Sequence, residues 1–143
     1  MIKPKIIEEL NALKNKISKC KELIDYCDRM SLSLGGQSFD VELVDHTRNF
    51  EAPFVKWIYK RIENEEKLKV LENEYSKVET KLNDYLLSFD EADEIKIIAM
   101  RYLQGYEWIT IQNELFMSES MMFRTHRKAL NRLKNIEEKN DSC

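Results

Sequence analysis

The sequence predicts an all-α protein, built as a long helical hairpin or coiled coil followed by a helix-turn-helix domain of three to four helices. Only 3 glycines and 2 prolines occur among 143 residues, so few positions favour turns. Two long stretches carry apolar residues at heptad spacing. The last third adds two short amphipathic segments joined by a tight turn, and the second of them is basic.

The first expected helix begins near Pro4, because proline suits the first turn of a helix, and it ends near Met30. Its apolar residues are separated by alternating steps of four and three, which is typical of a helix packed lengthwise on another. The two cysteines in this pattern are interpreted as packing residues rather than reactive thiols, since free cysteine behaves as a small hydrophobe. The heptad residues are Ile6, Leu10, Leu13, Ile17, Cys20, Ile24 and Cys27.

Residues 31–52 show no clear period, and Gly35 and Gly36 interrupt the heptad, so this segment is expected to be a loop. A short strand or a first helical turn around Val41–Val44 is the alternative. The segment holds four residue types that occur in metal and catalytic sites: Asp40, Glu42, Asp45 and His46. One histidine in a loop gives no convergent set of ligands, so we expect neither a metal ion nor another cofactor.

A second long helix is expected from Pro53 to Leu87, about 50 Å at 1.5 Å per residue. Its heptad residues are Leu71, Tyr75, Val78, Leu82, Tyr85 and Phe89, preceded less regularly by Trp57, Ile58, Ile62 and Leu68. A helix of this length must pack on the first helix, on a second copy of the chain, or on both, and the heptad pattern alone does not distinguish these. We expect a scaffold that forms a homodimer.

The run S-F-D-E at residues 88–91 matches a capping box, with Asp90 as an alternative cap. It predicts a helix over Glu91–Leu103 that turns Ile95, Ile98 and Tyr102 inward. The expected domains are therefore a coiled-coil region at 1–88, a helix-turn-helix domain at 89–136 and a disordered tail at 137–143.

The helix-turn-helix is expected to start after a break at Gly105, with Trp108, Ile111 and Leu115 on one face of its first helix. Ser118 is suited to cap the second helix, which runs to about Lys134. Its inward residues are Met122, Thr125 or His126, Ala129, Leu130 and Leu133. Five cations and a single acid, Glu119, lie between residues 118 and 135, although the whole chain has a net charge of -3.

The run G-Y-E-W-I-T-I-Q-N-E-L-F-M-S with the following F-R-T-H-R-K-A-L resembles region 4 of bacterial sigma factors. It is more similar still to the sigma-region-4-like regulators of late transcription in phages and prophages of Gram-positive bacteria, the ArpU, RinA and LtrC type. The matching residues are Trp108, Ile111, Leu115, Ser118, Arg124, His126, Ala129 and Leu130. The resemblance implies a regulator that binds promoter DNA and activates late operons, acting with host RNA polymerase.

Two residues depart from that pattern. Gln112 stands where a small residue usually lets the two helices approach, and its length would push them apart or demand a hydrogen-bonding partner. Phe116 stands in the turn where a glycine able to adopt positive φ is common. A turn of a different type is therefore expected.

The second helix supplies the candidate DNA-binding residues: Ser118, Ser120, Met121, Phe123, Arg124, Arg127, Lys128, Arg132 and Lys134. Those at its start are expected to reach base edges in the major groove, where Arg124 suits guanine O6 and N7, and Phe123 or Met121 a thymine methyl. Lys128, Arg132 and Lys134 are expected to neutralise phosphates. His126 is interpreted as a packed ring bonded to backbone rather than a phosphate contact.

Three hypotheses follow from the sequence. The first is a dimeric regulator that binds double-stranded DNA; the second is a sigma-like factor that meets DNA only within RNA polymerase; the third is a coiled-coil adaptor without DNA binding. An enzyme is not expected, because no nucleophile with a base and no phosphate-binding glycine loop is found. With no long apolar run, no charged leader and an odd cysteine count, we expect a cytoplasmic protein with no membrane contact and no small-molecule substrate.

Overall fold

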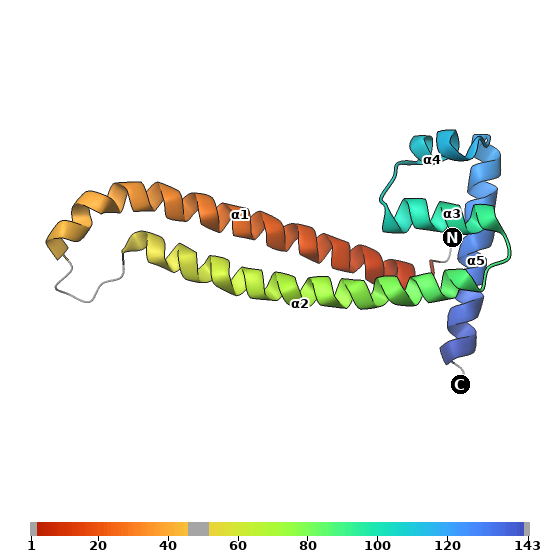
Figure 1. The fold of residues 1–143 in the computed structure, drawn as a ribbon, viewed down its shortest axis with the longest axis horizontal. Helices are drawn as coiled ribbons and strands as arrows, with labels where there is room; N and C mark the ends of the chain where they lie inside the picture. The colour runs from red at the N-terminus through yellow and green to blue at the C-terminus, as the bar shows by residue number, and fades with distance from the viewer. Residues whose placement is uncertain (1–2, 46–51, 142–143) are drawn as a thin grey trace. The chain divides into compact units, whose positions relative to one another are not determined.

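The computed structural model describes residues 3–45 and 52–141, and for residues 34–45 and 141 it describes the course of the backbone alone. Every regular element in these residues is helical, which confirms the predicted fold class. The elements are α1 (Lys5–Asp45), α2 (Pro53–Leu87), α3 (Ala92–Ile98), the π-helical turn η2 (Ala99–Leu103), α4 (Trp108–Leu115) and α5 (Glu119–Asp141). They form two compact units, residues 13–74 and residues 1–12 with 75–143, called here the hairpin unit and the two-segment unit (Figure 1).

In the hairpin unit, α1 and α2 run antiparallel and side by side (Figure 1). The heptad residues Leu13, Cys20 and Cys27 are buried in this contact. The Cys20 thiol donates to the carbonyl oxygen of Asn64 at 3.1 Å. The heptad pattern is thus satisfied within one chain.

Two further contacts join the same helices. The rings of Tyr26 and Trp57 meet edge to face, with centroids 5.5 Å apart. The Arg61 guanidinium lies 2.8 Å from the Asp28 carboxylate. This exposed ion pair contributes little to the free energy of unfolding, so apolar packing carries most of the contact.

Helix α1 continues well past Met30, to Asp45, so the predicted loop over residues 31–52 is wrong as far as residue 45. Gly35 and Gly36 lie inside the helix, where each costs about 1 kcal/mol relative to alanine, and no proline follows to stop it. Ser31 bonds back to the Asp28 carbonyl at 2.8 Å, so its hydroxyl is satisfied without leaving the helix. The residues considered for a metal site lie outside the described side chains.

The core of the two-segment unit draws on both ends of the chain. Ile6, Ile7 and Leu10 from the start of α1 pack with residues of α2, α3, η2 and α5. Their buried partners are Leu82, Tyr85, Leu86, Phe89, Ile98, Tyr102, Ala129, Leu130 and Leu133. The compact unit that contains α4 and α5 therefore combines residues 1–12 with residues 75–143, whereas the predicted boundary lay at residue 88.

The predicted disordered tail is also wrong over its described part, because α5 continues to Asp141. Glu137 lies one turn beyond Leu133 and is buried. Its carboxylate accepts bonds from the backbone amides of Lys5 at 2.9 Å and Ile6 at 2.8 Å. Free amides at a helix N-terminus, together with the helix dipole, favour a carboxylate there.

The predicted capping box before α3 does not form. The Ser88 hydroxyl donates to the Tyr85 carbonyl at 2.7 Å and so closes α2, while the N-cap residue of α3 is Glu91, without a side-chain cap. After α3 the helix widens into η2, and Gly105 then adopts φ 74°, ending the helix where the sequence predicted a break.

Candidate nucleic-acid interface

Helices α4 and α5 meet around a small apolar core. Ile111 and Met122 are fully buried at its centre. Trp108, Leu115 and Phe123 pack against them. Ile97 of α3 is buried in the same core, so α4 and α5 pack on each other and on α3.

The turn between these helices passes through Phe116, whose backbone is left-handed at φ 54° and ψ 45°. The expectation of a different turn is therefore wrong, because phenylalanine adopts the conformation that glycine would adopt. Its side chain is 94% exposed and meets no steric obstacle from the domain. The following amide, of Met117, closes the turn on the Gln112 carbonyl at 3.2 Å.

Ser118 caps α5 as predicted. Its hydroxyl accepts a bond from the Met121 amide at 3.2 Å, and its carbonyl accepts one from Met122 at 2.9 Å. This hydroxyl thus sets where the helix begins and which way its first turn faces. We assign Ser118 to positioning the helix rather than to contact with a ligand.

The outer face of α5 carries most of the predicted DNA-binding residues. Their side chains are exposed and lie three or four positions apart, so they share one helical face: Ser120, Met121, Arg124, Arg127 and Lys128. No ion pair with any described residue neutralises Arg124, Arg127 or Lys128. The face is therefore cationic, with guanidinium and ammonium groups directed to solvent.

Sequence reasoning missed Asn131, which is exposed on the same face, four residues after Arg127 and three after Lys128. Helical spacing was the signal that could have found it. Its amide adds a donor and an acceptor to a face otherwise made of cations, and asparagine suits the edge of adenine.

Two predicted contact residues lie elsewhere. Phe123 is half-buried, with its ring centroid 5.1 Å from that of Trp108, so it packs inward and does not join the outer face. Lys134 is half-buried along the side of α5. The helical stripe that buries Met122 and Leu130 also includes position 123, which explains the inward placement of Phe123.

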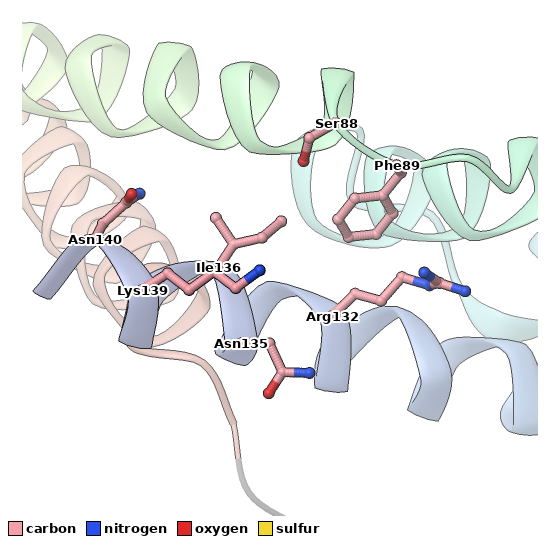
Figure 2. Close-up of a pocket in the computed structure, with 7 residues that line it drawn as sticks. All are labelled: Ser88, Phe89, Arg132, Asn135, Ile136, Lys139 and Asn140. Carbon is pink, nitrogen blue, oxygen red and sulfur yellow. The ribbon is translucent and has the colours of Figure 1, made fainter. Parts of the chain in front are cut away.

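Arg132 is the largest correction among the candidate cations. Its Nε lies 2.6 Å from Oε2 of Glu94, a carboxylate that is only 2% exposed. Figure 2 shows Arg132 on the side of α5 where Ile136 points toward Phe89. The charge of Arg132 thus balances a buried acid of α3, and its predicted role as a phosphate contact is not supported by this placement.

A cavity of about 480 Å³ opens beside Arg132 (Figure 2). It is lined by Ser88, Phe89, Arg132, Asn135, Ile136, Lys139 and Asn140. The α5 residues of the cavity lie C-terminal to the exposed cationic face, since Arg132 and Asn135 follow Lys128 by about one and two helical turns.

His126 is buried as a structural residue. Its Nε2 lies 2.7 Å from the Tyr102 hydroxyl, and its ring meets Trp108 edge to face at 4.7 Å. Burial, followed by the positive charges of Arg101 and Lys3, lowers the pKa of His126 to about 4. The ring is neutral at pH 7, and its partner is a tyrosine hydroxyl rather than the expected backbone group.

Arg101 supports the start of α4 and was not singled out in the sequence. Its guanidinium lies 4.5 Å from the Trp108 ring centroid and donates to the Tyr106 carbonyl at 3.0 Å. The aromatic residues five and seven positions later were the available signal. Arg101 therefore fixes the segment that leads into α4.

Among the described residues, no cluster of three metal-binding side chains occurs. No helix within the described ranges is long and apolar enough to cross a bilayer. Comparison with protein-family models, with curated proteins and with solved structures finds no match to this chain.

Proposed function

We propose that the chain is a transcription regulator that binds double-stranded DNA in a sequence-specific manner through α5. The observation that carries this proposal is the exposed row of Arg124, Arg127 and Lys128 on the outer face of a helix held by a helix-turn-helix core. Such a helix fits the major groove, and unpaired cations on it attract phosphates. The resemblance to late regulators of phages and prophages supports the same function, with RNA polymerase as a further partner.

The residues of this face take different roles in the proposal. Arg124 has the planar pair of donors that matches O6 and N7 of guanine, while Ser120, Met121 and Arg127 contact neighbouring base edges. Lys128 contributes to phosphate neutralisation, with Lys134 at the side of the helix. A homodimer would present two such helices to a repeated or palindromic site about one helical turn apart.

A second candidate is a sigma-like factor that meets DNA only as part of RNA polymerase. Ile109, in the first turn of α4, is 59% exposed, and Phe116, directly after α4, is 94% exposed. Exposed apolar side chains of this size favour contact with another protein. This candidate predicts weak DNA binding by the isolated chain.

The two candidates are separated by selection of duplexes from a random pool, at about 150 mM salt, where exposed charges are screened as in cells. Under the first proposal a motif is enriched, and Arg124→Ala weakens binding to it by about 1–3 kcal/mol and relaxes the choice at one base pair. Arg29→Ala, an exposed arginine of the hairpin unit, is the matched control and leaves the motif unchanged.

No enrichment from the folded wild-type chain would contradict the first proposal and favour the second. Equal binding of wild type and Arg124→Ala to every duplex would contradict the assignment of roles on α5.

A further inference from the structure

Within the hairpin unit, α1 covers one face of α2 and leaves the opposite face of α2 uncovered by α1. The side chains of Asn64 and Trp57 point to α1, as their contacts with Cys27 and Tyr26 show. Seven residues separate them, so they mark one face of α2. Any association of two copies through α2 must therefore use another face.

The first turns of α2 carry a second apolar row on that opposite face. Val55, Tyr59 and Ile62 follow one another by steps of four and three. Tyr59 is 58% exposed, Ile62 is 47% exposed and Val55 is half-buried. A surface helix normally has one apolar face, and a helix that is apolar on two faces is usually covered on both.

The charged residues beside this row are placed so that they can pair with the same residues of a second copy of the chain. Lys56 and Glu63 are exposed and lie seven residues apart along the same edge of the row. When two such helices pack antiparallel with Tyr59 beside Ile62 of the second copy, Lys56 lies near Glu63 of that copy, and Glu63 near its Lys56. Glu63 also lies 3.4 Å from Lys67, but both side chains are more than 60% exposed, and such a pair competes weakly.

We propose that a second copy of this chain covers the row of Val55, Tyr59 and Ile62 in an antiparallel, two-fold contact. This contact would be the surface through which the homodimer of the proposed function forms. Only its biological role rests on the proposed function, since the contact itself forms without DNA. Because few side chains take part, the buried area is small and the dimer is weak, with a dissociation constant in the micromolar range or above.

The test is sedimentation velocity of the full chain without DNA, over a wide range of concentrations. Ile62→Glu is expected to weaken dimerisation at least tenfold, because it places a charge in an apolar contact. Leu87→Glu, a similar change on a side chain of the same helix that is 83% exposed, leaves the dimer unchanged. Circular dichroism of each variant establishes that it is folded.

Charge reversal tests the antiparallel register directly. Lys56→Glu and Glu63→Lys are each expected to weaken dimerisation several-fold, and the double variant to restore it. A chain that stays monomeric throughout, a dimer indifferent to Ile62→Glu, or a double variant no better than the single ones would overturn the proposal. Because DNA is absent, these outcomes are independent of whether duplex selection succeeds.

Discussion

Glu94 places a carboxylate almost wholly inside the two-segment unit, balanced by Arg132 from α5. Their atoms are in contact at 2.6 Å, but Oε2 of Glu94 has no aligned hydrogen-bond donor among the described groups, so the pair is held by charge. Removing one partner of such a pair costs more than replacing both, because a buried charge is left alone.

We therefore expect Arg132→Ala to lower the free energy of unfolding by about 3 kcal/mol, and to cost much less when combined with Glu94→Gln. Urea unfolding of the wild type, Arg132→Ala, Glu94→Gln and the double variant measures both changes in free energy. Arg127→Ala, an exposed arginine of the same helix, should change stability by less than about 0.5 kcal/mol. Additive effects of the two substitutions would show that the pair does not act as a unit.

His126 makes the stability of the two-segment unit depend on pH. Its pKa is about 4 when folded and 6.5 as the ordinary value, so between these pH values the unfolded chain takes up a proton that the folded chain does not. Stability from this group therefore falls as pH drops from 6.5 to 4, by about 3 kcal/mol in all.

Urea unfolding of wild type and His126→Gln at pH 7 and pH 4 is the check. Carboxylates contribute equally to both proteins, so the wild type should lose more stability than the variant over this interval. Equal losses would mean that His126 is charged in the folded chain.

Single residues were predicted best where local chemistry decides them. Ser118 caps α5 because a hydroxyl before a helix reaches the amide three residues later, and the exposed positions of Arg124 and Lys128 follow from helical spacing. Arg132 was misassigned because its partner lies 38 positions earlier, on α3, and helical spacing alone is equally consistent with a side chain in solvent.

The element that most directly bears on the candidate interface is the turn before α5. Phe116 holds a left-handed backbone that costs a residue with a Cβ about 1–2 kcal/mol, while its side chain contributes almost no burial. Phe116→Gly should therefore raise the free energy of unfolding by about 0.5–1 kcal/mol, after allowance for the greater freedom of glycine in the unfolded chain.

Thermal unfolding provides the measurement, with Phe116→Val as the opposing variant, since a β-branched residue suits this backbone less well and should lower stability. If valine proves as stable as glycine, the turn does not hold the left-handed conformation in solution. Duplex binding of Phe116→Gly should match wild type under the first proposal, because α5 keeps its cap and its outer face.

At the level of elements, heptad spacing correctly indicated both long helices, and the bounds of α4 and the start of α5 match the prediction, while α5 continues seven residues past the predicted end near Lys134. The end of α1 was misplaced because two glycines weaken a helix without ending it. The capping box before α3 was misassigned because Ser88 can bond either forward to a new helix or back to α2, and only the packing of Phe89 in the core favours the second.

On the scale of the whole molecule, the Glu137 carboxylate joins two distant parts of the sequence. Its partners, the amides of Lys5 and Ile6, lie 132 and 131 positions before it. We expect Glu137→Gln to lower the free energy of unfolding by about 1–2 kcal/mol, because a neutral amide is a poorer partner for two amides at a helix N-terminus. Glu138→Gln, at an exposed neighbouring position, should have little effect. Chemical denaturation of the two variants at neutral pH checks this, and equal effects would contradict the assigned contact.

The fold class followed from composition and periodicity, but the grouping of elements into units did not. Ile6 and Leu10 belong to the same heptad as Leu13 and Cys20, yet they pack in the two-segment unit. Periodicity identifies which face of a helix is buried, but it does not identify the element that packs on that face. The same limit left open whether the heptads pair within or between chains.

The contribution of both chain ends to one unit also bears on how the protein is made. During synthesis the hairpin segments leave the ribosome first, and domains tend to fold as they emerge. The unit that carries α5 has to wait until Glu137 is available to hold the start of α1. A chain that stops before residue 137 would keep the row of Val55, Tyr59 and Ile62 but lack the Glu137 contact with the start of α1. Under the proposed dimer, such a chain would occupy the surface of a full copy without contributing a second complete two-segment unit.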